Sequence, residues 1–234
     1  MISTEVSLLI TDKLSRCSWK SAMPQPERVP LDRDKIVAAA TQLLDSVGLD
    51  GLSTRALATR LGVRSPALYW HFQSKGELVD AIAVAMLQGL GSAVPPDHGV
   101  DVATWLIERA QAFRRALLSH RDGARVHAGT TPGPQQMPSL NAQVEVLMRL
   151  GMTAGDASRA ALAISRYTVG WALEEQAQSH RDRNDHPKMN LQAFPDLEAA
   201  REVLEQHDPD EDFTFGLTAL VSGLTRQSYP VGRS

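Results

Sequence analysis

The chain has 234 residues, 43% of them hydrophobic and 22% charged, and its formal net charge at pH 7 is −3. These values are typical of a globular chain of one or two domains with enough residues for a core. The single cysteine, Cys17, excludes an internal disulfide framework, and no apolar stretch reaches the roughly 18 residues that span a membrane. We therefore expect a cytoplasmic protein without membrane contact, and a pI of about 6.2 excludes a surface that is basic throughout.

Residues 1–29 are expected to form a flexible arm before the folded part. The apolar run over 6–10 is too short for a secretory signal, and Pro24, Pro26 and Pro30 predict an extended chain. In an alternative interpretation the arm reaches DNA through its basic residues Lys13, Arg16, Lys20 and Arg28.

Residues 32–48 predict the first helix of the folded part. Asp32 is an expected N-cap, and Gly48 is the expected end. Between them apolar residues recur every three or four positions, at Ile36, Ala39, Ala40, Leu43, Leu44 and Val47. A short helix follows, with Ser53 as N-cap, Leu52 and Leu57 as a hydrophobic staple, and Gly62 as the left-handed residue that ends it.

A second short helix is predicted directly after this turn. Ser65 is the expected N-cap, Pro66 fits the first helical position, and the helix continues to Phe72. Two short helices about a glycine-containing turn are the signature of a helix-turn-helix.

The charges of this unit indicate what it contacts. Four basic residues and no acidic one lie between positions 51 and 76: Arg55, Arg60, Arg64 and Lys75. A local basic face on an acidic chain is typical of a phosphate-binding surface. Tyr69, Trp70 and His71 are consecutive and about 100° apart on a helix, so at least one aromatic ring must face outwards. The alternative is an ordinary helical hairpin with a solvated basic face.

The remaining chain also reads as helical, and no strand pattern is present. Ser74 and Glu77 form a capping box at the start of a helix that ends near Gly89 or Gly91, and residues 94–101 are the expected domain boundary. We expect a DNA-binding domain over 30–92 and a second domain over 101–228. Its expected parts are helices at 102–118, 140–150, 154–178 and 211–227, a turn at 120–129, and an acidic connection at 184–212 with a short helix at 196–206.

Small residues mark the two helices at 154–178 and 211–227. They are Ala160, Ala161, Ala163, Gly170 and Ala172 on the first and Gly216, Ala219 and Gly223 on the second. Such residues let another helix approach closely, and a two-helix patch doubled by a two-fold axis makes a four-helix bundle. We therefore expect a homodimer; in the alternative these faces meet only within one chain.

No catalytic motif is complete. Residues 120–122 spell HRD, as in a kinase catalytic loop, but the asparagine of that motif and a glycine-rich phosphate loop are missing. Two alternatives to a DNA-binding regulator remain open: a helical metal-dependent hydrolase that uses His120, Asp122, His127 and Glu174, and an architectural DNA-binding protein without a ligand.

TRALATRLGV at 54–63 and PALYWHF at 66–72, with Lys75 after them, resemble the DNA-binding domain of the bacterial TetR family of transcriptional repressors. The resemblance extends through ALLSHRDGARVHAGT at 116–130 and through 169–176, and is closest to the tetracycline-responsive branch. It implies an all-α protein in which an N-terminal three-helix domain with a helix-turn-helix joins a larger helical domain for ligand binding and dimerisation. It also implies a homodimeric repressor, not an enzyme, that releases a palindromic double-stranded operator when a small-molecule effector binds.

The same resemblance assigns site residues. The DNA-binding residues it implies are Thr54, Arg55, Arg64, Ser65, Pro66, Ala67, Tyr69, Trp70, His71 and Lys75. Arg64, Ser65 and Ala67 replace a glutamate, a glutamine and a threonine of the tetracycline-responsive branch, which predicts a different operator. By family analogy the effector tilts the helix at 77–89 and changes the spacing of two recognition helices, which must lie about 34–36 Å apart to enter successive major grooves.

The effector-binding residues that the resemblance implies are Arg109, Phe113, His127, Thr130, Pro132, Gln143 and Glu174. His127 matches the imidazole that ligates a drug-bound Mg²⁺, so the implied cofactor is Mg²⁺ together with the effector. The alternative for His127 is a loop histidine with a structural hydrogen bond. Leu90 with Gly91, Arg109 and Thr131 depart from the branch, remove polar contacts and add a cation, and so argue against tetracycline itself.

Overall fold

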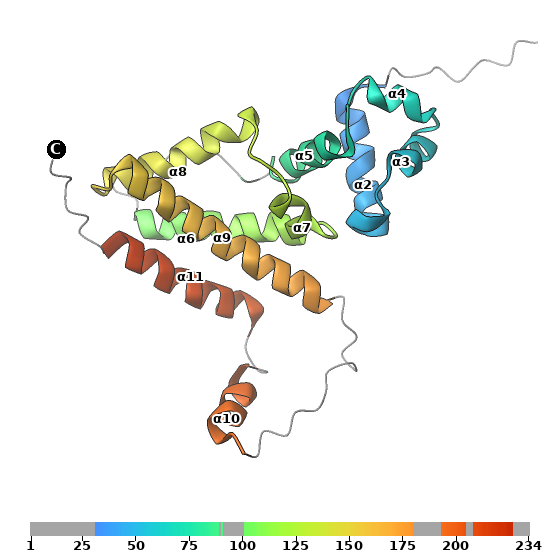
Figure 1. Ribbon diagram of the computed structural model, residues 1–234. Coiled ribbons are helices and arrows are strands. Elements are labelled where there is room, and N and C mark those ends of the chain that lie inside the picture. The colour runs from blue at the N-terminus through green and yellow to red at the C-terminus, as the bar shows by residue number, and fades with distance from the viewer. Residues whose placement is uncertain (1–30, 89, 91–100, 180–192, 205–207, 227–234) are drawn as a thin grey trace, which may run out of the picture. The chain divides into compact units, whose positions relative to one another are not determined.

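The structure is a computed structural model that describes residues 31–88, 90, 101–179, 193–204 and 208–226, and every regular element in them is helical (Figure 1). The expected arm at 1–29, most of the boundary at 94–101 and the acidic residues 184–192 lie outside the described residues. In the described ranges no helix is long and apolar enough to cross a membrane.

The helices are labelled as in Figure 1. The first group consists of α2 (Arg33–Gly51), α3 (Thr54–Leu61), α4 (Ser65–Tyr69) and α5 (Lys75–Met86). The second consists of α6 (Val102–Leu118), α7 (Gly123–Ala128), η1 (Pro134–Gln136, a 3₁₀ turn), α8 (Met137–Arg149), α9 (Ala154–Ser179), α10 (Pro195–Leu204) and α11 (Pro209–Arg226).

Helix α2 supports the helix-turn-helix by packing against α3 and α5. Its buried stripe comprises Ile36, Val37, Ala40, Leu43 and Leu44, whereas Val47, expected in that stripe, is 41% exposed. Gly48 has φ 74°, a left-handed conformation that glycine adopts readily, and the helix resumes beyond it to Gly51. The expected end at Gly48 is therefore a kink.

The caps of α3 are confirmed. The Ser53 hydroxyl accepts a hydrogen bond from the backbone N–H of Ala56 at 3.2 Å. Gly62 has φ 66°, and its N–H closes the helix on the carbonyls of Ala58 and Thr59. These local signals fix both ends of the first helix of the motif.

The ends predicted for α4 were wrong by a few residues. Arg64 rather than Ser65 is the N-cap, because the Arg64 carbonyl already accepts a hydrogen bond from the N–H of Ala67 at 2.9 Å. The Arg64 side chain makes no capping hydrogen bond. The helix ends at Tyr69 rather than Phe72. The N–H groups of His71 and Phe72 both turn back to the Leu68 carbonyl, which brings Phe72 into the core at 4% exposure.

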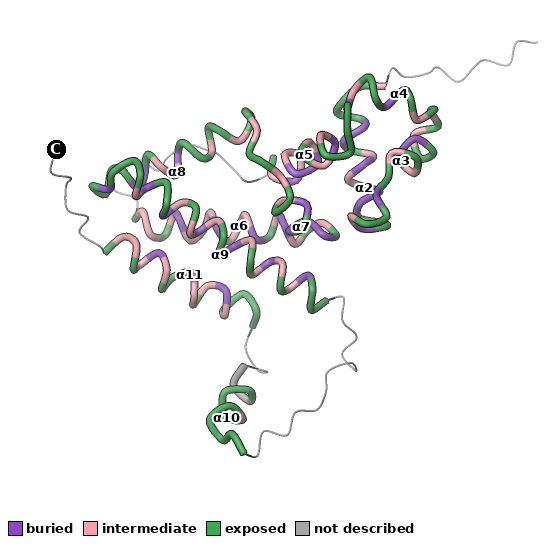
Figure 2. Tube along the Cα trace, in the orientation of Figure 1, coloured by how far each residue is buried: buried purple, intermediate pink, exposed green. Residues whose placement is uncertain are grey.

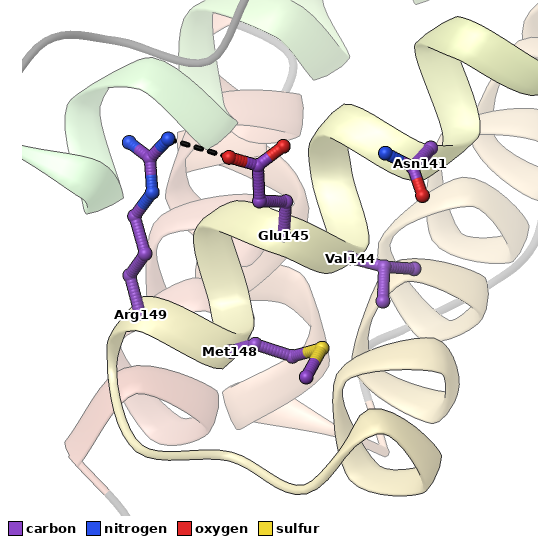
Figure 3. A pocket seen from close by; sticks show the side chains of 5 residues that line it. All are labelled: Asn141, Val144, Glu145, Met148 and Arg149. Carbon is purple, nitrogen blue, oxygen red and sulfur yellow. Dashed lines mark hydrogen bonds and ion pairs between the residues drawn. The ribbon is translucent and has the colours of Figure 1, made fainter.

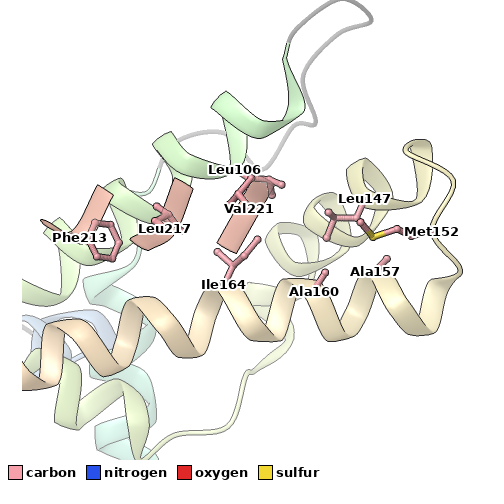
Figure 4. Close-up of a cluster of buried hydrophobic side chains, with 10 residues drawn as sticks. Leu106, Leu147, Met152, Ala157, Ala160, Ile164, Phe213, Leu217 and Val221 are labelled. Carbon is pink, nitrogen blue, oxygen red and sulfur yellow. The ribbon is translucent and has the colours of Figure 1, made fainter. Parts of the chain in front are cut away.

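Helices α6, α8, α9 and α11 enclose the larger core (Figure 4). Its buried members are Leu106, Ala110, Leu147, Met152, Ala157, Ala160, Ile164, Phe213, Leu217 and Val221. Buried and exposed residues alternate along α9, so this helix has one face in the core and one outside it (Figure 2). The described residues of α10 are mostly exposed, as expected for that connection.

A buried cation joins three of these helices. The Arg114 guanidinium on α6 pairs with Glu175 on α9 at 2.6 Å and with Asp210 on α11. Burial disfavours the charge, but the hydrogen bonds to both carboxylates outweigh it and raise the pKa of Arg114. The charge of this residue therefore holds the start of α11 against the core.

The predicted small residues divide into two groups. A side chain at Gly216 would collide with the Tyr167 hydroxyl, so this glycine permits α11 to approach α9 within one chain. Gly170 and Gly223 have no atom within 4 Å of an added Cβ. Gly170 lies on the exposed face of α9, together with Leu162, and Phe215 on α11 is 81% exposed. Gly216 thus serves helix packing within the chain, whereas Gly170 and Gly223 leave space in which a second helix could pack.

Candidate DNA-contact surface and effector site

All ten predicted DNA-binding residues are accessible. Six are exposed and four are half-buried; the exposed ones are Arg55, Arg64, Pro66, Tyr69, Trp70 and Lys75. Leu57, Leu68 and Phe72 of the same unit are buried and hold α3 and α4 to the core. The apolar positions thus point inwards and the predicted contact positions outwards.

The aromatic prediction is confirmed. Trp70 is 89% exposed and Tyr69 is 52% exposed, although both adjoin buried residues. Adjacent exposed aromatic side chains form an apolar patch, and such a patch beside basic residues is typical of a contact surface.

The basic residues on this surface are largely free to bind an anion. In the part of the chain that the structure describes, Arg55 and Arg64 form no ion pair. Arg60 donates only to the neutral Gln42 amide oxygen at 3.0 Å, and Lys75 donates to the Leu49 carbonyl at 3.3 Å. Among the described residues no carboxylate pairs with these four cations, so their charge is available for phosphate contacts.

The start of α5 is fixed by a modified capping box. Ser74 accepts from the N–H of Glu77 at 3.1 Å as predicted, but the Glu77 carboxylate accepts from the N–H of Gln73 rather than of Ser74. Arg33 also donates to Glu77 at 2.9 Å and to the His71 carbonyl at 2.6 Å. The Gln73 hydrogen bond, and then Arg33, lower the pKa of Glu77.

Four of the predicted effector residues, Arg109, Phe113, His127 and Gln143, make contacts on or next to α6. The Phe113 ring meets the His127 ring edge to face, with 5.0 Å between the ring centres. Arg109, one turn before Phe113, donates to the Ser139 hydroxyl of α8, and the Gln143 amide donates to the Ser139 carbonyl at 3.4 Å. Contacts thus join α6 to α7 at Phe113 and α6 to α8 at Arg109, and the four-residue spacing of Arg109 and Phe113 on α6 makes the two sets neighbours in one candidate site.

His127 does not lie in a loop, because residues 123–128 form α7 where a turn was predicted. Its Nδ1 is buried and has no hydrogen-bond partner among the described residues. The alternative for His127, a loop histidine with a structural hydrogen bond, is therefore not supported at this atom. Burial lowers the pKa of His127, so the imidazole is held in its neutral form.

Three other predicted effector residues are less enclosed. The Thr130 hydroxyl is used locally and donates to the His127 carbonyl at 2.9 Å. Pro132 is exposed, and Glu174 is exposed on the same outer face of α9 as Gly170. These positions rim the site or lie outside it in a single chain.

A second set of contacts joins α2 to the segment around residues 120–125, and sequence reasoning missed it. The Asp122 carboxylate accepts from the N–H of Leu49 at 2.8 Å, Asp45 contacts the His120 imidazole at 3.2 Å, and Arg125 pairs with Asp50 at 3.1 Å. Asp122 adopts φ 57° to do so. The HRD triplet at 120–122 resembles part of a kinase catalytic loop, but in the structure its side chains connect the two predicted domains.

One surface hollow lies on α8 (Figure 3). Asn141, Val144 and Met148 line it, beside the ion pair of Glu145 with Arg149 at 2.6 Å. None of these is a predicted effector residue, so the hollow is separate from the Phe113–His127 contact.

The described residues supply few metal ligands. No group of three or more His, Cys, Asp and Glu side chains within them could hold a metal ion. Among the described residues the buried Nδ1 of His127 has no hydrogen-bond partner, so this ring nitrogen is not committed to another group. Mg²⁺ usually keeps several waters beside one or two protein carboxylates and the oxygen atoms of its substrate, so an ion that arrives with an effector needs few protein ligands.

The helix-turn-helix with its exposed basic face and the helical second domain define a DNA-binding transcriptional regulator, and the chain belongs to the TetR family. Residues 36–82 match "Bacterial regulatory proteins, tetR family", and residues 95–228 match "Tetracyclin repressor-like, C-terminal domain".

Among known proteins, the chain is similar to the tetracycline repressor protein class A from transposon 1721 of Escherichia coli, with 45% identity over 84% of this chain and 92% of that protein. A TetR variant from Acinetobacter baumannii AYE in complex with minocycline has TM-score 0.70 and 39% identity, over 84% of this chain and 98% of that one. TetR class A in complex with 5a,6-anhydrotetracycline and magnesium has TM-score 0.64 and 42% identity, over 84% and 99% of the two chains.

Proposed function

We propose that the protein is a ligand-responsive transcriptional repressor that binds a palindromic operator and releases it when a small molecule binds the second domain. The observation that carries this proposal is the exposed face of α3 and α4, where Arg55 and Arg64 have no ion pair among the described residues. Phosphate contacts from such cations supply affinity, and contacts with base edges supply sequence preference.

A homodimer follows from the open face of α9. Gly170 leaves room for a second helix, and Leu162 and Phe215 expose apolar surface on α9 and α11. A two-fold pair of these helices would bury that surface in a four-helix bundle and present two α4 helices to one palindrome. The repressor would act in the cytoplasm, where its DNA is located, and the chain would carry no catalytic activity.

A route for the ligand response leads through α7. The helix carries His127 near its end and begins at Gly123, where an added Cβ would collide with Met86 of α5. Because α5 belongs to the predicted DNA-binding domain, α2 to α5, and packs against α7, a shift of α7 would move α5 directly. Only an effector that binds the two arrangements with different affinity can use this route.

We also propose that Mg²⁺ accompanies the effector and that His127 is its protein ligand. His127 would hold the ion, which would supply positive charge for binding an oxygen-rich effector. The neutral state of His127, which burial favours, keeps its ring nitrogen available for this role. Chelator and His127→Ala should then weaken effector binding alike, while operator binding without effector should not change.

Selection from a randomised DNA library with the full-length protein tests the function. We expect a palindromic consensus whose binding Arg55→Ala and Arg64→Ala each weaken. Arg115→Ala, which removes an exposed cation from α6, is the matched control and should leave binding unchanged. Recovery of no sequence preference would contradict the proposed function, as would a selected operator that no compound in a ligand library releases.

A further inference from the structure

Arg109 is a partly buried cation in the candidate effector site, and no carboxylate among the described residues pairs with it. Trp105, Arg109 and Phe113 follow one another at four-residue spacing and share one face of α6. The Arg109 guanidinium carbon lies 5.5 Å from the centre of the Trp105 ring, and the group donates to the neutral Ser139 hydroxyl. Within the described ranges, no Asp or Glu forms an ion pair with Arg109.

Arg114 on the same helix provides a comparison, because it is a buried cation with a structural role. Arg114 is buried, and it pairs with both Glu175 and Asp210. A charge removed from water is costly unless a partner compensates it. Burial lowers the pKa of Arg109, and no neighbouring charge opposes this effect. Arg109 thus has one neutral hydroxyl as its described hydrogen-bond partner, whereas Arg114 has two carboxylates.

The other groups of the site are neutral or apolar. The His127 ring packs against Phe113, and its buried Nδ1 has no partner in the described part of the chain. Gln143 presents an amide from α8 and is already tied to the Ser139 carbonyl. The site therefore combines aromatic faces with one positive charge.

We propose that the effector is an apolar ring compound with a carboxylate group, which Arg109 binds while the rings contact Trp105 and Phe113. This inference rests on the proposed function, because it defines the ligand class of the same site. The planar guanidinium can donate two parallel hydrogen bonds to such an anion, and such charge-assisted bonds are stronger than neutral ones.

A matched pair of probes tests the charge preference. Anthraquinone-2-carboxylate and anthraquinone-2-carboxamide have the same rings and differ in charge. Calorimetry with the full-length protein should show that the carboxylate binds about ten- to hundredfold more tightly. The preference should persist in buffers with Mg²⁺ and with EDTA, because it depends on Arg109 and not on a metal.

Variants assign the preference to one residue. Arg109→Gln should bind both probes equally, and Arg109→Lys should retain part of the preference because it keeps the charge but loses the planar fork. Arg115→Gln, which removes an exposed cation from the same helix, should behave like the parent. Thermal unfolding of each variant checks that it folds; if Arg109→Gln does not, the probe pair with the parent and with Arg109→Lys decides.

Three results would overturn the inference: equal affinity of the parent for both probes, no binding of either probe, or a preference that survives in Arg109→Gln. Operator binding measured on the same preparations separates this failure from that of the proposed function. A parent that binds its selected operator and yet shows no charge preference contradicts only the ligand class. A parent without a sequence-specific operator contradicts the function itself.

Discussion

Replacing Asp122 should weaken the connection between the DNA-binding helices and the effector domain. The residue is 7% exposed, its carboxylate accepts from the N–H of Leu49 at 2.8 Å, and it also pairs with Arg125 at 3.2 Å. Losing a hydrogen bond to a charged group costs about 1.5–3 kcal/mol. Alanine at φ 57° adds roughly 1 kcal/mol of backbone strain, so Asp122→Ala should lower the free energy of unfolding by about 2.5–4 kcal/mol.

Two further variants separate these contributions. Asp122→Asn keeps an oxygen acceptor and tolerates the left-handed backbone, so it should lose less stability than the alanine variant. Asp50→Ala removes an Arg125 partner whose side chain is 85% exposed, and should cost no more than about 1 kcal/mol.

Urea unfolding of the three variants and the parent, followed by circular dichroism, measures the effect on stability. Operator titrations with and without effector then measure whether ligand binding still reaches the DNA-binding half. Equal losses of stability for Asp122→Ala and Asp50→Ala would refute the reasoning. The same is true if Asp122→Ala loses stability while the effector reduces operator affinity as strongly as in the parent.

Four other outcomes follow from the structure. Gly170→Glu should bury an unpaired charge between two α9 helices and produce monomers, and a dimeric mass in light scattering would exclude this interface. Arg64→Ala should lose about 1–3 kcal/mol of operator affinity and relax preference at one base pair per half-site, as selection from a DNA library would show; a loss uniform over all sequences would place Arg64 on the backbone. Lys75→Ala should weaken all sequences alike and reduce the salt slope by about one, unless its bond to the Leu49 carbonyl persists on DNA. Because burial lowers the pKa of His127 below 6.5, its protonation favours the unfolded state, so stability should fall as the pH drops below about 6.5. His127→Asn should show a smaller fall in urea midpoint between about pH 7 and pH 5, and equal slopes would contradict the burial argument.

Much of the DNA-binding half could be predicted from sequence because its signals are local. Ser53 and Gly62 act through hydrogen bonds that span three or four residues, and such patterns are visible in a short window of sequence. The end of α4 was misplaced because Phe72 leaves the helix to enter a core built by distant residues. Local propensity does not contain that information.

The contacts of α7 could not be predicted in the same way. Two glycines and a left-handed Asp122 indicate a turn locally, yet Gln176 from α9 accepts from the N–H of Ala124 at 3.0 Å and supports a short helix there. The contacts of Leu49 with Asp122 and of Arg109 with Ser139 join residues 73 and 30 positions apart. Side chains so far apart in sequence leave no periodic signal, and one sequence does not show which of them meet.

The tryptophans make the functional parts of the protein optically distinct. Three of the four lie in the described residues: Trp70 is exposed at the end of α4, Trp105 lies beside Arg109, and Trp171 donates from its indole to Glu175 at 2.7 Å. Indole emission depends on the polarity and charge around the ring. Variants that keep one of these three indoles and replace the other three tryptophans, Trp19 included, with phenylalanine would therefore follow DNA contact, effector binding and core packing as separate fluorescence signals, without an attached dye.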